Sequence, residues 1–138
     1  MIDLKEIAKE LNLTTTKELR DNFSSYDGYI ELTIPIGNIH MISKEIFEAK
    51  TFDEAFECAN KYNEKRRFDF EDWRVPTLDE LALIYQISET FPHLFANHTT
   101  FWSSTTESKT HAWVIDFLFC CGEKTQNKLN PNNVILIR

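Results

Sequence analysis

Two helix starts of the same kind lie in the middle of this sequence, and they separate two regions with strand-like patterns. In Thr51-Phe-Asp-Glu54 and again in Thr77-Leu-Asp-Glu80, a threonine precedes a glutamate by three residues. In such a capping box, the hydroxyl and the carboxylate each accept a hydrogen bond from the other residue's backbone amide. Apolar residues follow at helical spacing, so the sequence predicts one helix from Thr51 to about Arg67 and another from Thr77.

Alternating apolar residues on both sides of these helices predict strands. Between Tyr29 and Ser43 they lie on either side of Gly37-Asn38, a typical sequence for a tight hairpin turn. After the second helix, shorter runs predict strands at residues 101–104, 111–120, 125–129 and 134–138. This order indicates the α+β class, with two helices flanking a mainly antiparallel sheet.

Length and composition fit one compact domain with a short N-terminal appendage. The chain has 138 residues, of which 42% are hydrophobic, so it can bury one core. Residues 29–138 are predicted to be that domain. Residues 1–28 are predicted to be a helical extension, because Leu4, Ile7 and Leu11 share one helix face. The extension also resembles the opening of a helix-turn-helix, which leaves a nucleic-acid-binding regulator as an alternative function.

The charge of the chain disfavours nucleic acids and anionic membranes as partners. Lys and Arg number 15 against 22 Asp and Glu, for a net charge of -7. The densest basic run is Lys65-Arg66-Arg67. It follows the first predicted helix, where positive charge complements the helix C-terminus, so we interpret it as a solvated cap.

We expect a cytoplasmic protein, or a secreted one if a signal has been removed. The first residues, MIDLKEIAKELNL, lack the basic start and apolar middle of a secretory signal. No apolar run approaches the length needed to span a membrane. The three cysteines do not suggest a disulfide framework and suit a reducing compartment.

Several separated stretches together resemble a known bacterial family. They are TFDEAFECANKYN at 51–63, DWRVPTLDEL at 72–81, FWSSTTES at 101–108, AWVIDFLF at 112–119 and the closing VILIR. In this order they are similar to the DUF1566 domain, also called the Lcl C-terminal domain, over about residues 29–138. The resemblance implies a C-type-lectin-like fold, a bacterial source, and a role in binding proteins or glycans; catalysis is exceptional on that scaffold. A phage source is an alternative that the resemblance itself does not imply.

The chain departs from the family pattern at one pair of positions. The half-cystine of the family's first helix matches Cys58, but the position of its partner holds Leu136. The resemblance therefore implies that the usual disulfide is missing here. Cys58 is then expected to act as a small buried hydrophobic residue.

No motif in the sequence predicts a catalytic site, a metal site or a cofactor, so we predict that the protein is not an enzyme. LNPNN at 129–133 has no adjoining carboxylate and indicates a turn rather than a calcium site. The histidines match no compact zinc spacing. Cys120 and Cys121 would point to opposite faces of a strand, and they leave a cysteine-based redox protein as a second alternative.

Apart from these alternatives, the sequence predicts a non-catalytic binding module that recognises a protein, or a glycan, through polar loops. The strand at 111–120 is apolar on both faces except at Asp116, for which Arg74 and Arg138 are candidate partners. The residues expected to be structural are Trp73, Arg74, Trp102, Trp113 and Asp116. The residues expected to bind the ligand lie in the later loops, because rigid scaffolds usually present binding groups there; they are His98, Glu107, Glu123, Lys124, Asn127 and Lys128.

Overall fold

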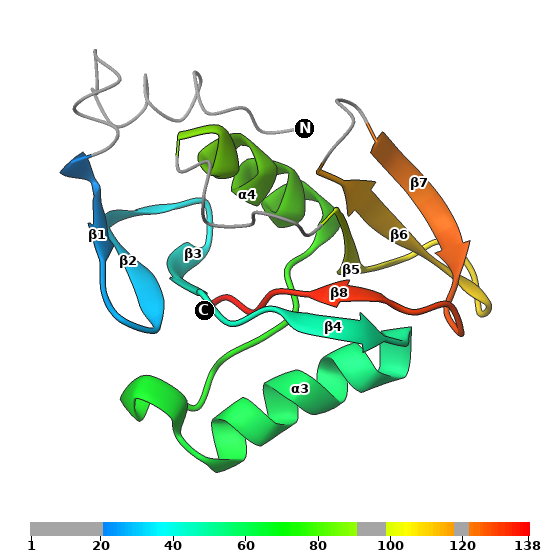
Figure 1. Cartoon of the computed structure of the whole chain (residues 1–138), viewed down its shortest axis with the longest axis horizontal. Coiled ribbons are helices and arrows are strands. Elements are labelled where there is room, and N and C mark those ends of the chain that lie inside the picture. The colour runs from blue at the N-terminus through cyan, green and yellow to red at the C-terminus, as the bar shows by residue number, and fades with distance from the viewer. Residues whose placement is uncertain (1–20, 91–98, 118–121) are drawn as a thin grey trace.

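The computed structural model describes residues 21–90, 99–117 and 122–138, and it confirms the α+β class (Figure 1). In these ranges four strands, β1 to β4, are followed by helix α3, a short 3-10 turn η1, helix α4 and strands β5 to β8. No helix in them is long and apolar enough to cross a membrane. The predicted N-terminal helix falls mainly on residues 1–20, and Cys120 and Cys121 on 118–121, both outside the described residues.

The first sheet is three-stranded and contains the predicted hairpin. It comprises β1 (Phe23–Ser25), β2 (Tyr29–Ile36) and β3 (Ile39–Ser43), paired antiparallel in that order. The hairpin turns at Gly37, whose φ of 58° lies in the left-handed region that glycine adopts without strain. β1 falls within the segment 1–28 that was predicted to be an extension, yet it pairs with β2 of the main domain.

The second sheet has five strands in the order β4-β8-β5-β6-β7. Neighbouring strands are antiparallel except β5 and β8, which are parallel. The prediction that the strand from His111 is an inner strand is correct, since β6 lies between β5 and β7. The strands are β4 (Phe47–Lys50), β5 (Thr100–Thr106), β6 (His111–Asp116), β7 (Gly122–Asn127) and β8 (Asn132–Val134).

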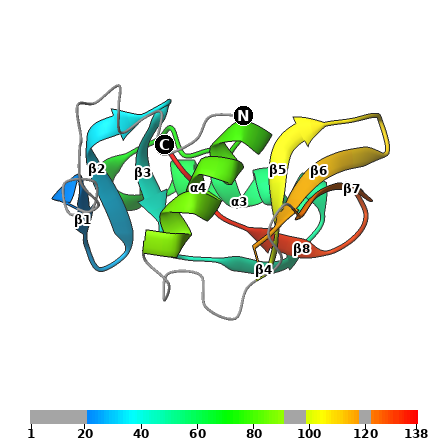
Figure 2. The ribbon, with the colours of Figure 1, turned by 90° about the horizontal axis from the view of Figure 1, so that it is seen from above.

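Both predicted capping boxes are present. α3 (Phe52–Glu64) begins after Thr51, and the Glu54 carboxylate accepts a hydrogen bond from the Thr51 amide at 3.0 Å. α4 (Leu78–Thr90) begins after Thr77 in the same way. α3 ends earlier than predicted, and η1 (Arg67–Asp69) follows it. The two helices lie on opposite sides of the β4 and β8 pair (Figures 1 and 2).

The last residues of the chain join the two sheets. They were predicted to form a strand over 134–138, but β8 ends at Val134, and Ile137 forms only isolated bridges with Ile42 and Arg74. The Met41 amide donates to the Arg138 carbonyl at 2.8 Å, and Ser43 donates to that of Leu136 at 2.9 Å. The closing segment therefore runs beside β3, at the start of the domain.

Two buried apolar clusters fill the space between the sheets and the helices. One lies around α4 and the inner faces of β2 and β3, and the other lies around α3 and includes Trp73 and Trp102. Trp102 is fully buried, and its indole N–H donates to the Lys50 carbonyl at 2.8 Å. Buried tryptophans usually satisfy this donor, which fixes the ring as well as burying it. Trp102 therefore links β5 to the start of α3.

Candidate functional site

The corner DWR at residues 72–74 is anchored from inside by Trp73. The ring is only 2% exposed, and its N–H donates to the Arg67 carbonyl at 2.9 Å. The side chain of Asn63, near the end of α3, bonds both the amide and the carbonyl of Trp73. The corner is therefore held by packing and by hydrogen bonds to the segment that precedes it.

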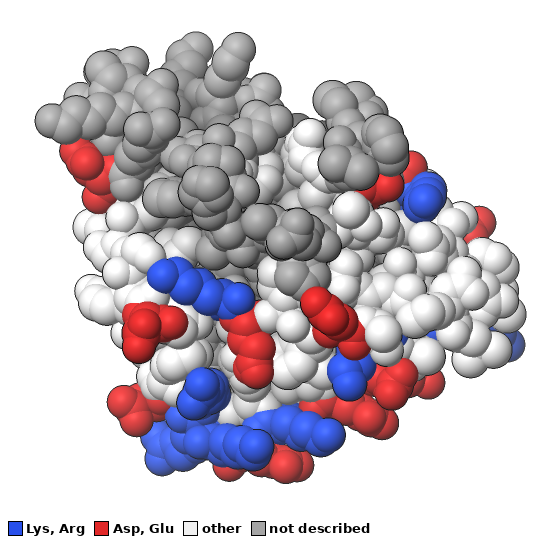
Figure 3. Space-filling view, in the orientation of Figure 1, with Lys and Arg blue, Asp and Glu red and all other residues white. Residues whose placement is uncertain are grey.

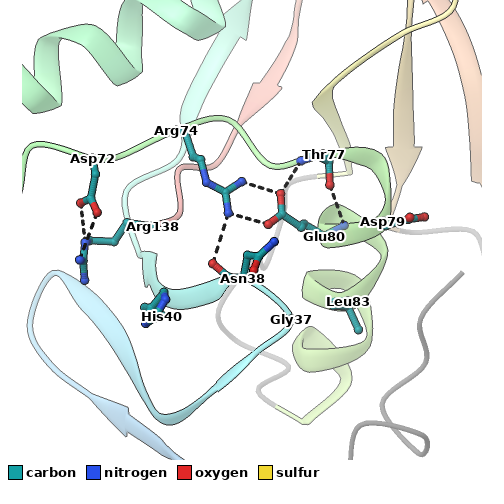
Figure 4. A pocket seen from close by; sticks show the side chains of 10 residues that line it. All are labelled: Gly37, Asn38, His40, Asp72, Arg74, Thr77, Asp79, Glu80, Leu83 and Arg138. Atoms are coloured by element: carbon teal, nitrogen blue, oxygen red, sulfur yellow. Dashed lines mark hydrogen bonds and ion pairs between the residues drawn. The ribbon is translucent and has the colours of Figure 1, made fainter.

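Arg74 is tied to the start of α4 through Glu80 (Figure 4). Both terminal nitrogens of its guanidinium lie 2.6 Å from a Glu80 carboxylate oxygen, which is bidentate geometry. The same carboxylate accepts from the Thr77 amide at 2.9 Å, so it is also the reciprocal cap of the helix. Burial alone would raise the pKa of Glu80, but the hydrogen bonds from Arg74 and Thr77 outweigh it and lower that pKa.

A polar pocket of about 640 Å³ lies in front of this ion pair (Figure 4). A second ion pair lines the same pocket, in which Arg138 Nε donates to the Asp72 carboxylate at 2.6 Å. This hydrogen bond lowers the pKa of Asp72. The Arg138 guanidinium also lies 3.7 Å from the centre of the Phe70 ring. Since both arginines are already engaged, the pocket joins parts of the fold and offers little charge to a ligand. Its lining residues are Gly37, Asn38, His40, Asp72, Arg74, Thr77, Asp79, Glu80, Leu83 and Arg138.

Three of the six predicted ligand-binding residues come together at one end of the five-stranded sheet. Glu107 lies in the turn between β5 and β6, while Asn127 ends β7 and Lys128 follows it. His111 pairs with Asn127 across the two strands, and the Lys128 amide donates to the Thr110 carbonyl at 2.8 Å. Leu129, which was not predicted, is 80% exposed beside them. We call Glu107, Asn127, Lys128 and Leu129 the turn surface.

The backbone of the turn surface is held on several sides. The Phe52 amide at the start of α3 donates to the Lys128 carbonyl at 2.9 Å, and the Lys128 ammonium lies 4.9 Å from the centre of the Phe52 ring. The side-chain oxygen of Asn127 accepts from the Leu129 amide at 2.9 Å. These bonds order the turn before any partner arrives, which reduces the entropic cost of binding.

The remaining predicted ligand residues do not join this group. Glu123 and Lys124 lie on β7 instead of in a loop, opposite Ile115 and Val114 and away from the turn end. His98 lies outside the described residues. The strand predicted at 125–129 is present as β7, but it begins earlier, at Gly122, and ends at Asn127. Its start was missed because Glu and Lys have low strand propensity and β7 is an edge strand with few apolar residues.

The predicted structural residues occupy different environments. Trp73 and Trp102 are buried, whereas Trp113 is only half-buried on β6. The expected partners of Asp116 are engaged elsewhere, since Arg74 pairs with Glu80 and Arg138 with Asp72. Cys58 is buried without a disulfide in the described part of the chain, and burial raises the pKa of its thiol. In the same part, His, Cys, Asp and Glu side chains form no group suited to hold a metal.

A second pocket, of about 450 Å³, lies between β4 and α3. Its rim carries Lys50, Lys61, Lys65 and Arg67, and its wall includes the rings of Phe47 and Tyr62. We call it the basic pocket. This pocket was not predicted from the sequence, because β4 was not predicted and Lys50 is distant from Lys65 along the chain. The basic run in the sequence contains two residues of this pocket, Lys65 and Arg67. Arg66 between them is not part of the pocket and pairs with Glu71 at 3.0 Å.

Comparison with known protein families supports the resemblance seen in the sequence. The family model described as the Lcl C-terminal domain matches residues 22–138. The match begins before Tyr29, where the resemblance was expected to start, and so includes β1. No curated protein matches the sequence.

Proposed function

The chain belongs to the Lcl C-terminal domain family, and from this premise we propose that it is a non-catalytic binding module that recognises a protein through the turn surface. The observation that carries the proposal is the position of Leu129. This side chain is 80% exposed on a turn that hydrogen bonds fix to both β6 and α3. A large apolar side chain held rigidly in solvent, with polar neighbours, is suited to act as an anchor at a protein interface.

We favour a protein partner over a glycan because of the chemistry of these four residues. Leu129 supplies apolar area, and the Lys128 ammonium is partly engaged by the Phe52 ring. Glu107 and Asn127 can supply polar contacts around the apolar centre, as at the rim of a protein interface. A glycan stays as the second ligand class.

We propose further that the fold is C-type-lectin-like. Three features support this proposal: the two helices lie on opposite sides of the β4 and β8 pair, the closing segment returns to β3, and the turns extend from one end of the five-stranded sheet. The cytoplasmic location also stays a prediction, and the buried, unpaired thiol of Cys58 is compatible with it.

Site-specific cross-linking tests the proposal. A photoreactive phenylalanine analogue replaces Leu129 in one variant and Ile34, a 40% exposed residue on β2, in a matched control. We expect the probe at position 129 to cross-link a discrete host protein, and unmodified protein in excess to suppress this product. Cross-linking of the same protein from both positions, or from neither, would refute the turn surface as the binding site.

A further inference from the structure

The basic pocket carries positive charge that opposes the overall charge of the chain. Lys50 comes from the end of β4, Lys61 from the last turn of α3, Lys65 from the C-cap of that helix, and Arg67 from η1. In Figure 3 several blue side chains lie at the lower left, over η1 and the adjoining end of α3, with red side chains beside them. Four cations face the single carboxylate of Glu45 in this pocket, whereas the whole chain has a net charge of -7. The pocket is therefore a local site for negative charge.

The wall of the pocket is aromatic. The rings of Phe47 and Tyr62 meet edge to face, with their centres 5.6 Å apart. The Tyr62 hydroxyl donates to Glu45 at 3.0 Å and shares a hydrogen bond with Ser43 at 2.9 Å. Since this hydroxyl is satisfied inside the protein, the two rings and the neighbouring Cys58 form the apolar part of the lining.

Ion pairing within the fold does not account for these cations. None of the ion pairs between residues that the structure describes uses Lys50, Lys61 or Lys65. Lys61 and Lys65 complement the C-terminal end of the α3 dipole, but they stand four residues apart and repel each other. Lys50 directly precedes the N-cap Thr51, where the helix dipole disfavours a cation. Its charge does attract the Glu54 carboxylate, the reciprocal cap of α3, so Lys50 has opposing effects on the helix start.

We propose that the basic pocket binds a short acidic peptide segment of a protein partner, with carboxylates at the lysine rim and one apolar side chain against Phe47 and Tyr62. A long polyanion such as a nucleic acid fits less well, because the net charge of -7 repels it beyond the pocket. Glu45 also disfavours a phosphate inside the pocket, whereas an apolar side chain can lie beside the Tyr62 ring. This site is separate from the turn surface and does not depend on it.

Fluorescence anisotropy with a defined peptide tests the proposal. The probe is a labelled Glu-Glu-Phe-Glu-Glu peptide, and its neutral counterpart is Gln-Gln-Phe-Gln-Gln. A single-stranded oligonucleotide of the same charge is the third probe. We expect saturable binding of the acidic peptide alone, weakened by added salt. Equal binding of the neutral peptide or of the oligonucleotide would overturn the proposal.

Two variants locate the binding. Lys61→Glu combined with Lys65→Glu should weaken binding by about tenfold or more. The matched control combines Lys109→Glu with Lys124→Glu, two exposed residues outside the pocket, and should bind like the wild type. Equal weakening in both double variants would show a general charge effect and overturn the assignment.

Lys50→Glu separates binding from folding. A negative charge next to Thr51 favours the helix dipole but repels the Glu54 carboxylate, so the two effects oppose each other and the melting temperature should change little while affinity falls by about fivefold. Unchanged peptide affinity in this folded variant would overturn the proposal. So would a concentration-dependent dimer that Lys50→Glu abolishes, because the occupant would then be a second copy of the chain.

Discussion

The side chain of Asn63 bonds both backbone groups of Trp73: its amide nitrogen donates to the Trp73 carbonyl at 2.9 Å, and its oxygen accepts from the Trp73 amide at 2.8 Å. Asn63 lies at the end of α3, and Trp73 lies beyond η1 in the corner that leads to α4. A single side chain thus replaces the pairing that a neighbouring strand would supply. The corner depends on the amide at position 63, because its nitrogen supplies the donor and its oxygen the acceptor for these two backbone groups.

Asn63→Asp should therefore destabilise the protein. The carboxylate can still accept from the Trp73 amide, but it has no donor for the Trp73 carbonyl. We expect a loss of about 1–3 kcal/mol in the free energy of unfolding, measured by urea denaturation at neutral pH. Asn60→Asp makes the same change on the exposed face of α3 and should cost less than about 0.5 kcal/mol. Similar losses in the two variants would contradict the role of Asn63.

The two capping boxes offer a matched measurement of the Arg74 ion pair. Glu80 caps α4 and also pairs with Arg74, whereas Glu54 caps α3 and forms no ion pair within the described residues. Glu80→Gln should lower the free energy of unfolding by about 2–3 kcal/mol. This loss is smaller than for a fully buried ion pair, because the Arg74 side chain is 38% exposed and solvent screens its charge. Glu54→Gln should cost much less. Equal losses would mean that the ion pair adds nothing to the cap.

The contribution of Glu80 should depend on pH. Its pKa in the folded protein is lowered, so it stabilises the fold above the pKa of the unfolded chain, and this contribution is lost as the pH falls through the folded value. The difference in unfolding free energy between the wild type and Glu80→Gln should be constant near neutral pH and shrink below about pH 4. A difference that grows on acidification would contradict the lowered pKa.

Trp102 should be more sensitive to substitution than Trp113, although both lie on neighbouring strands. Trp102→Phe removes the donor to the Lys50 carbonyl and leaves a space in the core. We therefore expect the free energy of unfolding, measured by thermal denaturation, to fall by about 2–4 kcal/mol. Trp113 is half-buried, and Trp113→Phe should cost less than about 1 kcal/mol. A larger loss for Trp113→Phe than for Trp102→Phe would contradict the packing described for these two strands.

The features that could be predicted from the sequence are those specified by neighbouring residues. Both capping boxes and the Gly37-Asn38 hairpin depend on groups within a few residues of one another, and the structure has all three. β1 and β4 are short, and their sequences show no clear alternation of apolar and polar residues. They form because they pair with β2 and β8, which are separate segments of the chain. Their absence from the prediction follows from that dependence on tertiary contacts.

The candidate binding surfaces also depend on tertiary contacts that the local sequence does not reveal. Glu107, Asn127 and Lys128 were predicted as polar loop residues, but nothing local indicated that pairing of β6 with β7 would bring them together at one end of the sheet. Leu129 was not predicted, since an apolar residue in a polar stretch gives no sign of its exposure. The pairing of Arg138 with Asp72 also depended on the path of the closing segment.

Leu129 is proposed to anchor a protein partner on the turn surface. The most direct test is the affinity of a purified partner, identified by cross-linking, for the Leu129→Ser and Ile34→Ser variants, measured by titration calorimetry. We expect Leu129→Ser to weaken binding about tenfold or more, while Ile34→Ser leaves the affinity within about twofold of the wild type. Binding of Leu129→Ser as tight as that of the wild type would contradict the proposal.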